Sequence, residues 1–341
     1  QLVGSQIAER NFFLWAQEEA ILSPHVRLQL GLRGDYFTFD VDDALELDPD
    51  PPGGLPHASG YTDGLIVSPK VNLVVTPVAG FDLFANVGQG FHSNDARKVV
   101  ITQRIDDRVR TLRQRGLNDA QINEQLVAER FDPNQRGATV LPAALGSELG
   151  TRVTVSDRLT VGAAGWLLDL EEEFVFVGDA GTTEPSGRTR RLGLDLEARA
   201  QVLPWLVADA DLTLSQGRLR DEAEGENFIP LAPTLTSTGG LTAQHPSGIR
   251  GSLRYRTIGD RPANESDTVT AEGYTVVDAL IGVEVGRAEI TLAAENLLDV
   301  SWNEAQFDTE SRLPGEVAPV SELHFTPGNP FNIRLGLGLH F

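Results

Sequence analysis

The last segment of the chain alternates between apolar and polar side chains without a break. From Phe331 to Phe341, every odd position is apolar and every even position is polar or glycine. Because successive side chains of a strand point to opposite faces, this segment predicts one strand with a wholly apolar wall. About ten residues of this kind are enough for a tilted strand to cross a bilayer. A soluble sheet can place the same strand on its core, so the rest of the chain must decide.

The same period of two recurs along the chain. Residues 191–202 carry leucine, alanine or valine at every even position, and charged residues, glutamine or glycine at every odd one. Residues 26–32 and 206–215 follow the same scheme, and residues 249–258 alternate with Arg250, Ser252, Arg254 and Arg256 at the even positions. A period of two indicates strands, whereas helices repeat every 3.6 residues.

Composition narrows the class of protein. No stretch approaches the roughly twenty apolar residues of a membrane helix, and the mean hydropathy of -0.16 fits a barrel whose inner wall is polar. Thirty-four glycines favour an all-β fold, and the lack of cysteine excludes disulfides and thiolate metal sites. The net charge of -21 argues against a nucleic-acid partner.

We expect about thirteen strands in an antiparallel transmembrane β-barrel. They are predicted at 6–21, 25–40, 62–76, 81–92, 148–156, 159–177, 188–202, 206–220, 231–244, 249–258, 271–285, 288–302 and 331–341.

The predicted connections alternate between short and long, as they do in outer-membrane barrels with short periplasmic turns and longer external loops. Tight turns are expected at 22–24, 77–80, 157–158, 203–205, 245–248 and 286–287. Long polar loops are expected at 41–61, 93–147, 178–187, 221–230, 259–270 and 303–330.

Five short motifs, in this order and spacing, resemble the barrel of TonB-dependent outer-membrane receptors. They are Gly88 to Arg97, Ile229 to Pro233, Gly273-Tyr274, Glu295 to Asp299 and Phe325 to Pro330 before a last strand ending in Phe. The resemblance implies a barrel of about 22 strands, plugged by an N-terminal domain. It also implies uptake of a scarce ligand, such as a ferric siderophore, with energy relayed by TonB.

The sequence departs from this family at its front end. We find no recognisable plug domain and no TonB box, and position 1 is Gln rather than Met. An odd number of strands does not close in the even-numbered manner of bacterial barrels. We therefore expect residues 1–341 to be a partial barrel domain, the C-terminal part of a receptor in the bacterial outer membrane.

The expected partners follow from that resemblance. They are outer-membrane lipid, the TonB system acting through a plug domain outside this chain, the barrel-assembly machinery, and an iron chelate or other small ligand. We expect Phe341 to serve as an assembly signal, and we expect no cofactor, no metal and no nucleic acid.

The long loop at 93–147 is predicted to contain a helical hairpin. Ile101, Ile105, Val109 and Leu112 recur at helical spacing, and Gly116 can end that helix. Asn118 followed by Gln121 resembles a capping box for a second helix, at the start of which both side chains would bond backbone N–H groups.

Arginines of this loop are candidate ligand contacts. A rim loop usually carries recognition, and guanidinium groups suit an anionic chelate. The alternative is a solvated face on which these arginines pair with Asp106, Asp107 and other acids. The candidates are Arg97 at the start of the loop, and Arg104, Arg108 and Arg115, which can share one helix face.

Three arginines on the polar face of 249–258 offer a second candidate site. Arg250, Arg254 and Arg256 would draw anions into the barrel lumen. Alternatively they would pair with lumenal acids such as Asp278 and Glu284, or with the plug.

Two other functions stay open at this point. One is a self-contained passive pore of about fourteen strands, with the lumenal arginines as an anion filter. The other is an outer-membrane barrel enzyme, although no His pair has metal spacing and nothing places a Ser-His-Asp triad together. We expect no enzymatic activity. The run Glu171-Glu172-Glu173 is predicted to be a solvated face.

Overall fold

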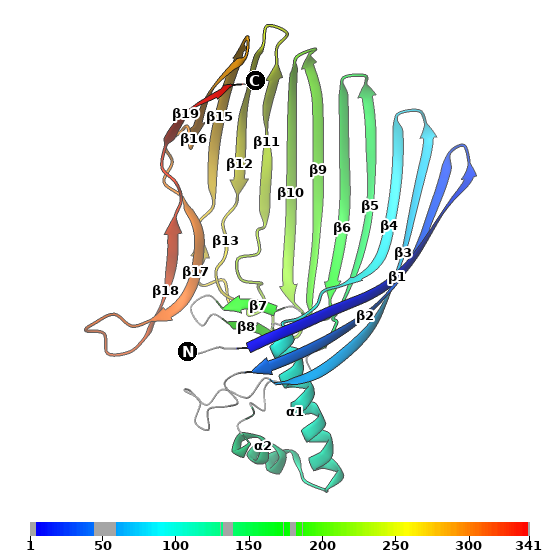
Figure 1. Cartoon of the computed structure of the whole chain (residues 1–341), viewed down its shortest axis with the longest axis vertical. Helices are drawn as coiled ribbons and strands as arrows, with labels where there is room; N and C mark the ends of the chain where they lie inside the picture. The colour runs from blue at the N-terminus through cyan, green and yellow to red at the C-terminus, as the bar shows by residue number, and fades with distance from the viewer. Residues whose placement is uncertain are drawn as a thin grey trace.

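A computed structural model describes residues 5–43, 59–129, 131, 139–172, 174–177, 182–185 and 187–339. Thirteen strands form one antiparallel sheet, in which they lie side by side in the order in which they occur in the chain (Figure 1). Within these residues the sheet is open, with β1 (Ser5–Ser23) at one edge and β19 (Asn332–Leu339) at the other. The expected strand number and antiparallel order are therefore confirmed.

The remaining strands of this sheet lie between those two edges. They are β2 (Val26–Asp43), β3 (Gly60–Val78), β4 (Phe81–Phe91), β5 (Ala143–Ser156), β6 (Leu159–Leu170), β9 (Thr189–Leu203), β10 (Leu206–Leu219), β11 (Leu235–Gln244), β12 (Ile249–Ile258), β15 (Tyr274–Val285) and β16 (Ala288–Glu295). All six predicted tight turns are confirmed, and in Figure 1 they lie together at the upper end of the sheet.

Among the described residues, three short hairpins outside the main sheet differ from the predicted strands and loops. The predicted strand 159–177 stops at Leu170, and its last residues form β7 (Phe174–Val177), which pairs with β8 (Thr182–Pro185) outside the main sheet. The predicted loop 303–330 contains a hairpin of β17 (Asn303–Ser311) and β18 (Val320–Pro327). Near the end of β12 lies the small pair β13 (Arg261–Pro262) and β14 (Thr270–Ala271).

The strand predicted at 288–302 ends early because Asn296 turns the chain. Asn296 is 1% exposed and adopts the left-handed conformation, with φ at 49°. Its side chain accepts a hydrogen bond from the Val300 N–H at 3.0 Å and donates to the Asn329 carbonyl at 3.1 Å. An asparagine tolerates this conformation and ties its own turn together, so the motif Glu295 to Asp299 forms a corner rather than a strand.

The strand register gives the sheet two chemically different walls. Asp209 lies opposite Arg199 and Asp211 opposite Glu197, on the same side of the sheet. Leu212 lies opposite Leu196 and Leu214 opposite Leu194, on the other side. We call these sides the polar wall and the apolar wall. The leucines of the apolar wall are widely exposed, Leu335 at 69% and Leu337 at 77%.

Aromatic rings lie against glycines on the polar wall. A Cβ at Gly193 would lie 2.4 Å from the Trp166 ring, and one at Gly150 would lie 2.4 Å from the Phe84 ring. Such distances are too short for real side chains. Glycine at 193 and 150 therefore lets each ring lie against the neighbouring backbone.

The hydrophobic pattern of β2 reverses its phase along the strand. In its first part, Leu28, Leu30 and Leu32 are on the apolar wall. Beyond Tyr36 the opposite side becomes apolar, because Phe37, Phe39 and Val41 are buried. The β2–β3 register runs unbroken through this region, so these three residues continue the polar wall. They form the surface on which the helices pack.

The predicted helical hairpin is confirmed and packs on that surface. Helix α1 (Ala96–Gln114) places Ile101, Ile105, Val109 and Leu112 in one buried cluster with the β2 aromatics. Helix α2 (Asp119–Ala128) adds Ile122 and Leu126 to the same cluster. The hairpin lies at the long-loop end of β1 to β3 (Figure 1).

Both helix starts are capped as their sequences suggest. The Asp95 carboxylate accepts hydrogen bonds from the first turn of α1, and Asn118 and Gln121 form the expected capping box of α2. Among the described residues, neither helix combines the length and the apolar character needed to cross a membrane. Phe341 lies outside the described residues.

Candidate functional site

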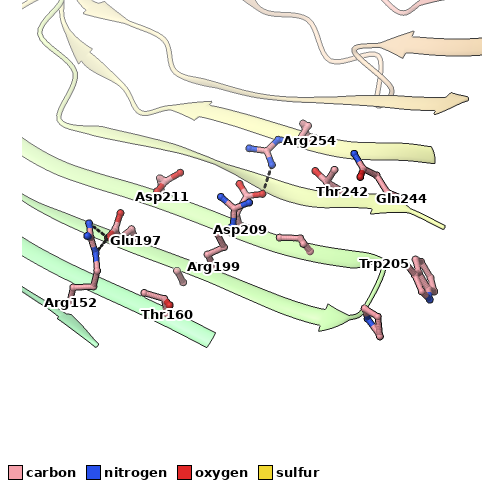
Figure 2. Close-up of a pocket in the computed structure, with 13 residues that line it drawn as sticks. Arg152, Thr160, Glu197, Arg199, Trp205, Asp209, Asp211, Thr242, Gln244 and Arg254 are labelled. Carbon is pink, nitrogen blue, oxygen red and sulfur yellow. Dashed lines mark hydrogen bonds and ion pairs between the residues drawn. The ribbon is translucent and has the colours of Figure 1, made fainter. Parts of the chain in front are cut away.

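The polar wall is hollowed at the centre of the sheet, near the tight turns. A cavity of about 740 Å³ is lined by charged and polar side chains of β5, β6 and β9 to β12. The Arg152 guanidinium lies 3.3 Å from Glu197, and that of Arg254 lies 2.6 Å from Asp209 (Figure 2). The two residues of each pair come from strands that are not adjacent, so each ion pair spans one intervening strand.

Arg254 reaches Asp209 because a glycine lies between them. In the register, Asp209 is opposite Gly240 on β11, and Gly240 is opposite Arg254 on β12. Gly240 has no side chain to block the guanidinium. Asp278, one of the acids expected to pair with the three arginines of β12, instead accepts a hydrogen bond from the Asn296 N–H at 2.9 Å.

Arg250 lies near two acids, and one of them, Glu284, was expected as a partner for the arginines of β12. Its guanidinium lies 3.9 Å from Glu284 and also pairs with Glu289 on β16. These contacts match the structural interpretation, in which lumenal arginines balance lumenal acids. Arg250 and Arg254 are thus both held by carboxylates of the polar wall.

Arg256 differs from its two neighbours on β12. Its guanidinium lies over the Trp302 ring, 5.0 Å from the centroid, and no ion pair with a described acid holds it. Arg256 and Trp302 line a second cavity of about 440 Å³ toward the long-loop end of β12, β15 and β16. The Trp302 indole is fixed by donating to the Asn329 carbonyl at 3.1 Å. Trp302 was not among the predicted site residues.

Three of the four loop arginines are tied to neighbouring groups. Arg97 pairs with Asp95 at 3.1 Å, beside the cap of α1. Arg104 donates to the Ser59 carbonyl at 2.7 Å and lies over the Phe131 ring. Arg108 donates to the Glu129 carboxylate at 2.8 Å.

Arg115 interacts with its neighbour Glu129 only through its charge. It is the exposed C-cap residue of α1. The structure therefore does not bring the four arginines together on one free surface. Arg108 pairs with Glu129 rather than with Asp107, and Asp107 pairs with Arg110 at 3.3 Å.

The Arg108–Glu129 pair joins the two helices. The hydrogen bond from Arg108 is the main reason that the pKa of the Glu129 carboxyl lies below its ordinary value, and a further hydrogen bond from Gln125 acts in the same direction. Glu129 is therefore charged at neutral pH, and the pair fixes the C-terminal end of α2 to α1.

A buried glutamate, Glu172, holds the end of the long loop where the chain returns to the sheet. Glu172 is 9% exposed, so the expectation of a solvated face is wrong for this residue. Its carboxylate accepts a hydrogen bond from the Thr139 N–H at 2.7 Å, and its carbonyl contacts the His92 ring at 2.9 Å. Burial raises the pKa of the Glu172 carboxyl. Its neighbour Glu173 lies outside the described residues.

Within the described ranges, no three His, Cys, Asp or Glu side chains are grouped so that they could hold a metal ion. The side chains that line the two cavities offer guanidinium, carboxylate, hydroxyl, amide and indole groups.

Comparison with known proteins places the chain in a family. A family model described as TonB dependent receptor-like, beta-barrel, matches residues 3–297. The ferrioxamine receptor of Yersinia enterocolitica is 28% identical over 138 residues, which make up 37% of this chain and 19% of that receptor.

Two solved structures are similar to almost the whole chain. The ferric yersiniabactin uptake receptor FyuA from Yersinia pestis gives a TM-score of 0.68 at 13% identity, covering 99% of this chain and 46% of FyuA. The ferric-catecholate import receptor Fiu from E. coli K12, in its closed form, gives a TM-score of 0.67 at 18% identity, covering 99% of this chain and 46% of Fiu. The chain thus spans less than half the length of either receptor, and at these identities the likeness establishes the fold.

The two walls and the alternation of short and long connections are those of an outer-membrane β-barrel. The family model, which matches most of the chain, leads to the same conclusion. The chain belongs to the TonB-dependent receptor-like β-barrel family, whose members reside in the outer membrane of Gram-negative bacteria.

Proposed function

We propose that this chain is the barrel portion of an outer-membrane receptor for TonB-dependent uptake of a scarce ferric chelate. The observation that carries the proposal is the sheet of thirteen antiparallel strands, arranged in chain order, with one apolar and one polar wall. The ferrioxamine receptor and both structural neighbours are named for ferric ligands, which supports an iron chelate as the cargo.

The proposal assigns each wall a partner. The apolar wall faces outer-membrane lipid, and the polar wall faces water and a plug domain outside this chain. TonB would act on that plug, and the barrel-assembly machinery would read the last strand and Phe341. The proposal includes no catalytic step.

Among the predicted ligand contacts, Arg256 has the best support. It lines the cavity near the long-loop end, and its guanidinium is positioned by Trp302 rather than neutralised by a carboxylate. Arg115 is also exposed and remains a candidate. Arg97, Arg104, Arg108, Arg250 and Arg254 already contact other groups of the chain, and we propose that they position the loop and the wall.

A self-contained passive pore is less well supported. In the described part of the chain, β1 and β19 pair with one strand each and not with each other. Two open strand edges in lipid leave backbone groups without hydrogen bonds, which is costly.

Iron uptake by a deletion strain tests the proposal. A strain lacking the gene should lose TonB-dependent uptake of radioactive iron supplied as one ferric chelate, tested over a panel that includes ferrioxamine. The intact gene should restore uptake, and the Arg256→Ala variant should restore it with a raised apparent KM. Unchanged uptake across the panel would contradict the proposal, as would stable ion conductance by this chain alone in planar bilayers.

A further inference from the structure

One arginine near the long-loop rim is buried without a partner. Arg261 on β13 is only 8% exposed, and its Nη1 atom has no hydrogen-bond partner among the residues that the structure describes. No acid of the described ranges forms an ion pair with it. A buried charge is costly unless it is paired and hydrogen-bonded. This guanidinium therefore favours the binding of an anion.

Arg261 lines a cavity of about 460 Å³ between the β10–β11 loop and the β13–β14 pair. A second arginine, Arg218, lines the same cavity. Its guanidinium lies over the Phe228 ring, 4.0 Å from the centroid, and donates to the Gly217 carbonyl at 2.8 Å. Two positively charged side chains therefore line one cavity, in a chain whose net charge is -21.

The acids of the cavity do not neutralise these two arginines. Asp260 accepts a hydrogen bond from the Gly273 N–H at 2.7 Å, and Asp267 is exposed at the end of a turn. Neither carboxylate lies within ion-pair distance of Arg218 or Arg261. The two guanidinium groups, the Gln216 amide and the Thr270 hydroxyl are donors that line the cavity. The Ser215 and Thr234 hydroxyls, which also line it, already donate to the Pro233 and Asp260 carbonyls.

The cavity is held in shape by its own backbone. The Phe228 N–H donates to the Glu265 carbonyl at 3.0 Å, and the Leu231 N–H donates to the Pro262 carbonyl at 2.7 Å. These bonds join the two loops, and Ile229 is buried between them at 4% exposure. Preorganised donors lose little freedom when a ligand binds.

We propose that this cavity is an oxyanion-binding site in which Arg261 binds a carboxylate or phosphate group and Arg218 assists. The planar guanidinium fork binds such groups through two parallel hydrogen bonds. The site is independent of the proposed uptake function, because it rests on the buried charge alone.

Calorimetric titration of the protein, purified from outer membranes in detergent, with inorganic phosphate and with citrate tests this site. We expect saturable binding to the natural protein and an affinity at least about tenfold weaker in Arg261→Met. Arg261→Lys, which keeps the charge but not the fork, should fall between them. Absence of saturable binding to the natural protein, or equal binding by Arg261→Met, would overturn the proposal.

A matched variant separates binding from folding. Arg190 is bound to Asp169 through two hydrogen bonds of 2.7 and 2.8 Å. Arg190→Met should lower the thermal midpoint and leave phosphate affinity unchanged. Arg261→Met should instead raise the midpoint of the ligand-free protein, because it removes a buried charge that has no partner. A lowered midpoint in Arg261→Met with unchanged binding would mark Arg261 as purely structural and refute the site.

Uptake measurements then identify the source of the oxyanion. If the group belongs to the transported chelate, Arg261→Met slows uptake of ferric citrate, and phosphate competes with that uptake. If uptake is unchanged while phosphate binding is lost, the site binds a free anion. Both results support the site, and they stay separate from any failure of the uptake proposal.

Discussion

Phe39 of β2 and Ile105 of α1, far apart in the sequence, are both completely buried and belong to one hydrophobic cluster. Phe39 projects from the side of β2 that carries Arg27 and Gln29 nearer the tight turn. The helical hairpin is therefore anchored on the lumenal side of the barrel rim.

Truncation of this cluster should loosen the hairpin and leave the barrel intact. Ile105→Ala leaves a cavity in a closely packed site, and we expect it to lower the local unfolding free energy of α1 and α2 by about 2–5 kcal/mol. Hydrogen exchange measured by mass spectrometry should show faster exchange in residues 96–128 alone. Val127 on α2 is 61% exposed, and Val127→Ala serves as the control with little effect. Equal exchange in the two variants would contradict anchoring through Ile105.

Acid should weaken the contact between the two helices. The pKa of Glu129 is lower in the folded protein than in the unfolded chain, mainly because of the hydrogen bond from Arg108. The stabilisation is therefore fully present above the unfolded pKa, and it is lost as pH falls through the folded pKa. Limited proteolysis between pH 7 and pH 3 should show the hairpin opening at the acidic end. Glu129→Gln should flatten this dependence, and a pH profile identical to that of the natural protein would count against the pair.

The contact of the Trp166 ring with Gly193 predicts a strong difference between two glycine substitutions. A Cβ at Gly193 would lie 2.4 Å from the Trp166 ring and 2.7 Å from the Leu214 carbonyl oxygen, whereas a Cβ at Gly34 has nothing within 4 Å. We expect Gly193→Ala to destabilise the barrel by about 1–3 kcal/mol, as overpacking does. The urea midpoint of the purified protein measures this effect. Gly34→Ala should stay close to the natural protein; a similar shift in both would mean that Trp166 moves aside freely.

Much of the fold was predictable because alternate residues of a strand face two different environments, and the sequence alternates accordingly. Residues 191–202 alternate between apolar residues on the apolar wall and charged residues, glutamine or glycine on the polar wall, and β9 follows them from Thr189 to Leu203. The helical hairpin was equally clear, since its apolar spacing and the capping residues Asn118 and Gln121 agree. Local signals of this kind need no knowledge of the rest of the chain.

Contacts between distant segments were not predictable in the same way. Arg254 pairs with Asp209 because Gly240 lies between them in the register, and a register across three strands cannot be inferred from one sequence. The burial of Glu172 depends on where residues near Thr139 return to the sheet. The reversal of the hydrophobic phase in β2 at Phe37 is visible in the sequence, and it marks where the buried apolar residues of β2 change to the side of the polar wall.

Spin labels on adjacent residues of β9 test most directly whether lipid covers the apolar wall. The chain contains no cysteine, so Leu194→Cys and Asp195→Cys each create a single labelling site. In outer membranes, we predict that oxygen dissolved in lipid relaxes the label at 194 more strongly, and that an aqueous nickel complex relaxes the label at 195 more strongly. A label at 194 that is immobile and inaccessible to both reagents would mean that the apolar wall packs against protein, and would contradict a membrane-spanning barrel.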